Sequence, residues 1–412
     1  MRPLKPYVTT ALFGLCSLIL AGSLLLFPET SFLAALRGLK IWWDVVFPAL
    51  LPFFITSEIL LGLGLAHFMG VLLEPLMRPI FNVPGHGSFV WTMGFSSGYP
   101  IAAKLTVRLR EQNVISRAEG ERLVSYTTTA DPVFITGAVA IGFFHSAKVG
   151  LVLLISHYTT AVLVGLLMAR HNRKGERTPY QPDISKPIVL RALAAMHRAR
   201  LKDGRAFGKL MGDAVATSLQ TQLLLGGFIL FFSVLLDLFT KLKVIALLSG
   251  ALGYALALFG YPLEAAQALI YGLFEVTLGA KQSSDLFVSL SPAFVMAIAS
   301  AILAWGGLSV HAQVASMLAE TDIRYRPFLV ARLCHAALSF LFTYTVGMNL
   351  YGRLQQSAQG AMPVWLPSFD PSRDSLWTLS ASSFQTYALL VCLALLVFTI
   401  ISAQIGAWLT RK

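Results

Sequence analysis

The sequence predicts an all-α polytopic membrane protein with inverted structural repeats, broken helices and re-entrant hairpins. Its composition indicates a membrane protein: of 412 residues, 56% are hydrophobic and 13% are charged, and the mean hydropathy is +0.69. A soluble domain carries about 25% charged residues. Several apolar runs are long enough to span about 30 Å of hydrocarbon. The repeats are indicated by polar motifs that interrupt these runs in both halves of the chain.

The first expected element is a transmembrane helix near residues 7–27, within an N-terminal segment 1–39. Its apolar run is long, and residues 27–29 lack the small residues of a cleavage site, so we expect a retained helix rather than a signal peptide. Arg2 and Lys5 precede this helix. Basic residues beside a span favour the cytoplasmic side, which places the N-terminus there.

A first gate-like repeat is expected over residues 40–169. It opens with a helix near 44–66 that contains Pro48 and Pro52, followed by an amphipathic, interfacial piece at 68–82. Later in this repeat the pattern predicts a charged helix near 101–112, another helix from about 116, and a long apolar helix at 147–169.

A basic linker at 170–208 follows the first repeat. Eleven Lys and Arg residues against three acids lie in 170–209, which indicates a cytoplasmic loop. Residues 186–200 have the apolar spacing of a surface helix. No nucleic-acid partner is expected, because no aromatic residues for stacking on bases alternate with these charges. The remaining segments are a second gate-like repeat at 209–348, a nearly neutral, non-cytoplasmic loop at 349–383, and a C-terminal transmembrane helix at 384–412 with a basic, cytoplasmic end.

Each repeat is interrupted twice by a polar motif. The first repeat carries GFSSGYP at 94–100 and TTTADP at 127–132, and the second carries FEVTLGAKQ at 274–282 and GGLSVH at 306–311. A polar, glycine-broken segment inside a membrane is costly unless it lines a cavity or is buried in protein. Paired interruptions in the two halves of a membrane protein indicate the substrate site of a secondary transporter.

The chemistry of these motifs suits an anion. A broken helix leaves free N–H groups, and its N-terminus carries about half a positive charge. A lysine follows one interruption in each repeat, and intramembrane lysines usually mark function or a paired charge. The predicted substrate-binding residues are Ser96, Ser97, Gly98, Tyr99, Lys104, Thr128, Thr129, Asp131, Glu275, Thr277, Gly279, Lys281, Ser309 and His311. Coupling to protons or sodium through Asp131 or Glu275 is left open, as is a homo-oligomer.

Structural roles compete with these assignments. Lys104 could extend to the membrane interface alongside Arg108. Lys281 could form an ion pair with Glu275 or Asp285. The glycine, serine and threonine positions could simply allow close helix packing.

Histidines and cysteines give no sign of a metal or catalytic centre. His157 and His335 lie in apolar helices and are expected to be buried hydrogen-bonding groups. Cys16, Cys334 and Cys392 have no metal-ligand spacing and imply no disulfide framework. No nucleotide-binding loop or nucleophile-and-base motif is present in the sequence, so neither an enzyme nor a cofactor is expected.

At residues 94–100 with Lys104, and at 274–279, the sequence resembles the YlbJ/SpoVV-type sporulation integral membrane proteins, which contain two nucleoside-recognition (gate) domains. The resemblance covers about 10–350 and the last helix. The gate domain is in turn similar to the core of concentrative nucleoside transporters, an inverted repeat with re-entrant hairpins. The resemblance implies a role in spore formation, moving dipicolinic acid from the mother cell across the outer forespore membrane.

The leading hypothesis is therefore a carrier for a small organic anion in a bacterial cell membrane or the outer forespore membrane. A nucleoside carrier of the same fold is the first alternative, although Ser96-Ser97-Gly98 stands where nucleoside carriers have a Gln-Thr-Glu run. A non-transporting membrane scaffold needed for spore maturation is the second alternative.

The topology can be tested by cysteine labelling. Single cysteines at Ser185 and Ser357, in a background that lacks the three native cysteines, should differ in labelling by an impermeant thiol reagent. Position 357 should react from outside and position 185 only after permeabilisation, because loop charge places them on opposite sides. Equal labelling from outside would contradict the inverted arrangement.

Overall fold

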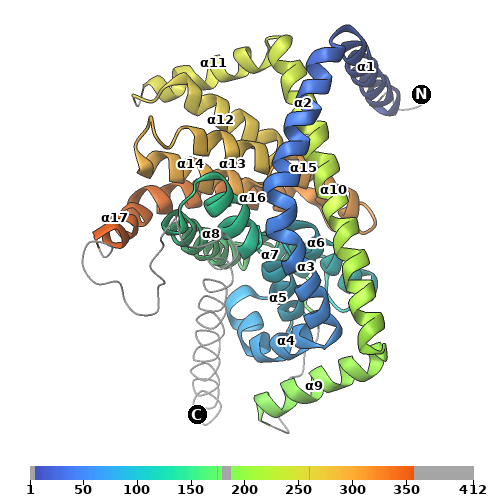
Figure 1. Cartoon of the computed structure of the whole chain (residues 1–412). Helices are drawn as coiled ribbons and strands as arrows, with labels where there is room; N and C mark the ends of the chain where they lie inside the picture. Colours follow the sequence, from blue (N-terminus) through green and yellow to red (C-terminus); the bar gives the residue numbers. More distant parts are fainter. Residues whose placement is uncertain (1–4, 174, 179–186, 259, 357–412) are drawn as a thin grey trace.

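The computed structural model describes residues 5–173, 175–178, 187–258 and 260–356, and these residues form an all-α polytopic membrane protein (Figure 1). Within them, five helical segments are long and apolar enough to cross a membrane: Pro28–Gly62, Ala147–Met168, Phe207–Lys241, Pro292–Leu318 and Tyr325–Gln355. The predicted fold class is confirmed. The predicted C-terminal helix at 384–412 and most of the predicted loop at 349–383 lie outside the described residues.

The first half of the chain begins with two N-terminal helices and ends with a long apolar helix. Its elements are α1 (Lys5–Leu26), α2 (Pro28–Ile41), η1 (Trp42–Val46), α3 (Phe47–Gly62), α4 (Leu65–Leu76), η2 (Met77–Phe81), α5 (Gly87–Ser97), α6 (Tyr99–Glu111), α7 (Arg117–Thr127), η3 (Phe134–Phe143) and α8 (Ala147–Met168).

The second half begins after the basic linker. Its elements are α9 (Ile188–Asp203), α10 (Phe207–Lys241), α11 (Val244–Ala257), α12 (Leu263–Phe274), α13 (Val276–Asp285), α14 (Pro292–Trp305), α15 (Gly307–Leu318), α16 (Tyr325–Phe342), η4 (Thr343–Gly347) and α17 (Met348–Gln356).

The N-terminal region differs from the single helix expected within residues 1–39. α1 corresponds to the helix expected at 7–27, but α2 starts at Pro28, where proline suits a first helical turn. α2, η1 and α3 then form one continuous helical run to Gly62. The early start of this run was not predicted, because residues 28–43 mix polar and apolar side chains. This long run packs along α10 (Figure 1).

The α5–α6 pair and the α12–α13 pair each form a tight hairpin, named hairpin 1 and hairpin 2 here. In hairpin 1, a methyl group added at Gly94 would lie 2.9 Å from the Ala102 side chain, so the two helices fold back at Gly98. In hairpin 2, a methyl group at Gly279 would lie 2.2 Å from the Gly272 Cα. Glycines thus permit the close approach of both arms.

Two further helices are broken in the middle. The first runs from α7 through extended residues 128–131 into η3, and the second runs from α14 through Gly306 into α15. The φ angles of Gly306 and Gly307 are +87° and +82°, which only glycine adopts without strain. Together with the hairpin tips at Gly98 and Glu275, these interruptions are called breaks 1 to 4 in chain order: 98, 128–131, 275 and 306.

Ion pairs join the two halves at one end of the molecule. Arg110 at the end of α6 makes a bidentate pair with Asp322 (2.8 and 3.0 Å), and Arg324 makes one with Glu121 of α7 (2.7 and 3.0 Å). Hydrogen bonds from Arg110 hold the pKa of Asp322 below its ordinary value. Ile323 packs against Gly120 between the two pairs. These four charged residues are called the clamp.

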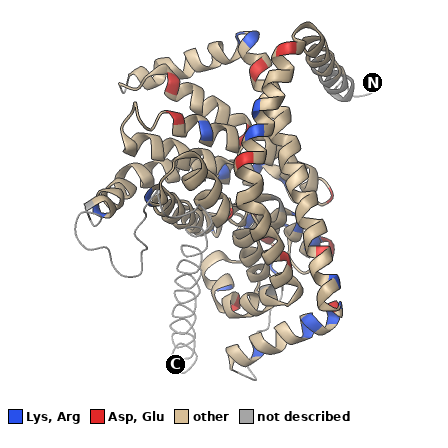
Figure 2. Cartoon of the chain, in the orientation of Figure 1, with Lys and Arg blue, Asp and Glu red and all other residues tan. Residues whose placement is uncertain are grey.

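The basic linker lies at the same end as the clamp. His171, just after α8, lies 2.7 Å from the Glu121 carboxylate through Nε2. α9 packs on α4, where Arg191 pairs with Glu74 at 2.7 Å. Figure 2 shows Lys and Arg gathered along α9 and the start of α10. The helix expected at 186–200 is therefore present, and basic charge is concentrated at this end.

The close approach of the two arms of hairpin 2 predicts that a methyl group added at Gly279 lowers the stability of the protein. Gly279→Ala should destabilise the protein by about 1–3 kcal/mol, because its methyl group would overlap the Gly272 backbone. Gly250→Ala in α11 is the matched control, since no atom lies within 4 Å of its added methyl group. Thermal unfolding in detergent should show a lower midpoint for the first variant only. Equal midpoints for both variants would contradict the tight hairpin.

Candidate functional site

The four breaks lie against one another inside the helical bundle. A methyl group added at Gly98 would lie 3.2 Å from Oδ2 of Asp131, which connects break 1 to break 2. One at Gly306 would lie 3.3 Å from the ring of Tyr99, and one at Gly307 would lie 3.0 Å from the Glu275 Cα. Break 4 therefore touches the tips of both hairpins.

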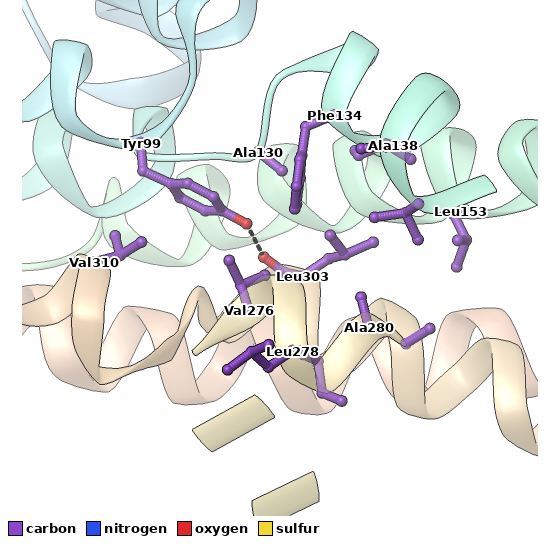
Figure 3. Packing of buried hydrophobic residues seen from close by; sticks show 14 of the residues in the cluster. Tyr99, Ala130, Phe134, Ala138, Leu153, Val276, Leu278, Ala280, Leu303 and Val310 are labelled. Carbon is purple, nitrogen blue, oxygen red and sulfur yellow. Dashed lines mark hydrogen bonds between the residues drawn. The ribbon is translucent and has the colours of Figure 1, made fainter. Parts of the chain in front are cut away.

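Tyr99 joins the tip of hairpin 1 to the second half. Its side chain is buried, and its hydroxyl donates a hydrogen bond of 2.6 Å to the carbonyl of Leu303 in α14. Figure 3 shows the ring reaching Leu303 between Ala130 of the first half and Val276 of the second.

Two buried acids cap the helices that start at breaks 2 and 3. Asp131 Oδ1 accepts hydrogen bonds from the backbone N–H groups of Val133 (3.0 Å) and Phe134 (2.8 Å). Glu275 Oε2 accepts one from the N–H of Leu278 (2.8 Å). Each acid therefore satisfies N–H groups that a helix start leaves unpaired, and lies at the positive end of a helix dipole.

Arg332 of α16 is fully buried between breaks 2 and 4. Its Nη1 donates to the carbonyls of Thr128 (2.5 Å) and Ala304 (3.4 Å), and its Nη2 donates to the carbonyl of Ser125. These carbonyls lie at the C-terminal ends of α7 and α14. The guanidinium thus stabilises the negative ends of two helix dipoles, one from each half.

Comparisons with known proteins bear on this arrangement. The family model for nucleoside recognition (Gate) matches residues 43–171, which run from η1 past the end of α8 and include breaks 1 and 2. The sporulation integral membrane protein YlbJ of Bacillus subtilis (strain 168) is 47% identical over 345 residues, which cover 84% of each chain. The chain belongs to this YlbJ family. The predicted family is thereby confirmed, and the protein is an integral protein of the lipid bilayer.

Two side chains of α8, His157 and Tyr158, form hydrogen bonds to the backbone of break 2. His157 Nε2 accepts a hydrogen bond from the N–H of Ala130 (3.1 Å), so the ring is neutral with its proton on Nδ1. The Tyr158 hydroxyl donates to the carbonyl of Ala130 (2.9 Å). His335 of α16 donates through Nε2 to the carbonyl of His157 (3.0 Å). The two histidines are buried hydrogen-bonding groups, as expected.

Several buried polar atoms around the breaks have no hydrogen-bond partner among the described residues. They include Arg332 Nε, Thr129 Oγ1, Ser300 Oγ, His157 Nδ1 and His335 Nδ1. Orphaned polar groups are rare in native proteins and usually indicate a bound water, ion or ligand. Together with the convergence of the four breaks, these five atoms support this region as the candidate site.

The remaining predicted residues differ in burial and in their distance from the breaks. Thr128, Thr129, Thr277 and Ser309 are buried at the breaks, and His311 is buried against Tyr325 (2.6 Å to its hydroxyl) and the carbonyl of Trp305 (3.2 Å). Ser96 and Ser97 are half-buried in the last turn of α5, where the Ser96 hydroxyl bonds to the carbonyl of Thr92. Gly279 serves the close packing of hairpin 2.

The two lysines lie farther from the breaks along the second arm of each hairpin. Lys104 is exposed on α6. Lys281 on α13 forms an ion pair with Asp285, which is one of the two pairings considered from the sequence. Neither ammonium group makes a hydrogen bond to a break among the described residues.

Arg332 and Tyr158 are the residues of the site that the sequence analysis missed. The available signal for Arg332 was an arginine within the largely apolar stretch 328–342, which calls for a buried partner. Its partners are carbonyls that lie 28 to 207 residues away, and no motif spacing reveals them.

Tyr99 provides a test of the junction between the halves. Tyr99→Phe should destabilise the protein by about 1–3 kcal/mol, because the buried Leu303 carbonyl would lose its donor. Tyr254→Phe, on an 82% exposed side chain of α11, is the control and should leave stability unchanged. Chemical or thermal unfolding in detergent would measure both, and an unchanged Tyr99→Phe variant would show that this bond contributes nothing.

Proposed function

We propose that this protein is a cation-coupled carrier for a small organic anion. One observation carries the proposal: two hairpin tips and two broken helices, from both halves of the chain, meet around buried polar groups. Membrane carriers place their substrate at such points, where interrupted helices expose backbone polar groups in the middle of the membrane.

We further propose that residues 40–169 and 209–348 are two gate-like repeats of opposite orientation. In each, a long helix and a shorter helix are followed by a hairpin, a helix with a central break, and a final long helix. Hairpin 1 packs against α15 and hairpin 2 packs against η3, so each hairpin contacts the broken helix of the other repeat. Reciprocal contacts of this kind are those of a pseudo-twofold arrangement.

Charge at the breaks supports cation coupling. Arg332 contributes one positive charge, whereas Asp131 and Glu275 contribute two negative charges when ionised. A dianion entering such a site would meet a net negative environment of low dielectric, where repulsion is strong. Protons or sodium ions on Asp131 and Glu275 would remove that repulsion. Binding of the anion would thus require binding of cations.

For the substrate, we propose dipicolinic acid moved across the outer forespore membrane. The relative's name links the family to sporulation, and dipicolinate is a planar aromatic dianion that fits helix N-termini flanked by rings such as Tyr99 and Phe274. Lys104 and Lys281 would attract the anion along the hairpins. The nucleoside alternative is favoured only by the description of the Gate family.

We propose that the basic linker and both termini face the cytoplasm. Basic charge is concentrated on α9 and the start of α10 (Figure 2). Short basic segments remain on the cytoplasmic side of bacterial membranes.

Uptake into proteoliposomes tests the carrier. Labelled dipicolinate should accumulate when a proton or sodium gradient is imposed, and excess uridine should not compete. Asp131→Asn with Glu275→Gln should abolish the dependence on the gradient, because neither amide titrates or carries charge. Empty liposomes give the background.

Other outcomes point elsewhere. Uptake of uridine that ignores dipicolinate would replace the anion carrier by a nucleoside carrier. Absence of uptake of either compound, with folded protein present, would favour a membrane scaffold.

A further inference from the structure

We propose that Arg332 binds a carboxylate of the transported anion through its Nε edge and so sets the preference for dicarboxylates. This inference rests on the proposed carrier function and names the positive group of its site. It was not among the residues expected from the sequence, where Lys104 and Lys281 were considered instead.

Two other arginines in the structure show how a carboxylate binds at this edge. Arg110 and Arg324 both bind their carboxylate partners through Nε and Nη2, at 2.7 to 3.0 Å. In Arg332 the Nη groups donate to three carbonyls, but Nε has no partner among the described residues. A guanidinium has five N–H donors, so Nε–H and one Nη–H remain for a ligand.

The distribution of charge also indicates the Arg332 guanidinium as the anion-binding group. Among the described residues, no carboxylate lies within 4.0 Å of Arg332, so no ion pair neutralises its charge, and its Cζ lies 5.7 Å from the centre of the Phe328 ring. Lys281 already pairs with Asp285, and Lys104 is exposed. A buried, unpaired guanidinium gains most from an anionic partner because the surrounding medium screens little.

A second unpartnered donor, the Thr129 hydroxyl, belongs to the residue next to an Arg332 partner. The Thr128 carbonyl accepts a hydrogen bond from Arg332 Nη1. The hydroxyl of the next residue, Thr129, is buried without a partner in the described part of the chain. A carboxylate at break 2 could accept from Nε–H and from this hydroxyl. The two orphaned donors would then be satisfied together.

Arg122 is a matched control. It is also fully buried and also donates to three backbone carbonyls, those of Asn82, His171 and Asn172. The Nε of Arg122 donates one of these hydrogen bonds, and the side chain lies near the clamp end rather than at a break. Replacing it removes a buried guanidinium without touching the proposed site.

The experiment compares dipicolinate, with two carboxylates, and picolinate, with one, as ligands of the detergent-purified full chain by calorimetry, in a mildly acidic buffer that contains sodium so that both proposed cations are present. We expect the wild type to prefer dipicolinate. Arg332→Gln should weaken dipicolinate binding about ten- to a hundredfold and picolinate binding much less, since one charge-assisted contact is lost. Arg332→Lys should restore binding only in part, because an ammonium lacks the bidentate edge. Arg122→Gln should keep the wild-type ratio.

The outcomes separate this inference from the carrier proposal. If the wild type binds neither acid, the proposed function itself fails. If the wild type prefers dipicolinate and Arg332→Lys keeps the same ratio, Arg332 is only a structural group and the inference is overturned. Arg332→Lys retains the buried charge, so it decides the matter even where Arg332→Gln does not fold.

Discussion

The structure depends on the need to satisfy backbone polar groups where helices stop inside a membrane protein. Each unsatisfied N–H or carbonyl costs several kcal/mol in hydrocarbon. Four breaks create many such groups in a small volume, and side chains from the same helix start and from distant elements supply the partners. Asp131 and Glu275 accept from N–H groups, whereas Arg332 and Tyr99 donate to carbonyls. The N–H groups at breaks 2 and 3 are therefore satisfied locally, whereas carbonyls at the breaks are satisfied across the two halves.

The α8–α16 contact shows how the halves are joined at the centre. The rings of His157 and His335 lie 4.8 Å apart, and the hydroxyls of Thr160 and Ser339 share a hydrogen bond of 2.6 Å. The same two helices supply His157 and Arg332 to break 2. Their packing thus fixes the position of the break relative to both halves.

The sequence predicted the fold class, the broken segments and the helix on the linker, because hydropathy, glycine and charge are local signals. It also predicted Asp131 and Glu275 as residues at breaks. It did not predict the early start of the α2–α3 run, since residues 28–43 lack a continuous apolar pattern. Nor did it identify Arg332, whose partners are backbone carbonyls brought near by tertiary packing. For Lys281, sequence left a binding role and a pairing with Asp285 open, and the structure shows the pairing.

The clamp makes ionic strength act unevenly on the contact between the halves. The carboxylate of Glu121 is fully buried, whereas the side chain of Asp322 is 48% exposed. The Debye length falls from about 8 Å at physiological salt to about 3 Å at 1 M, so concentrated salt weakens exposed ion pairs and affects buried ones much less. High salt would weaken the Arg110–Asp322 pair more than the Glu121–Arg324 pair, whose carboxylate is buried although the Arg324 side chain is 52% exposed. The turn that carries Asp322 and Arg324 would then be held mainly by the Arg324–Glu121 pair and could rotate about it.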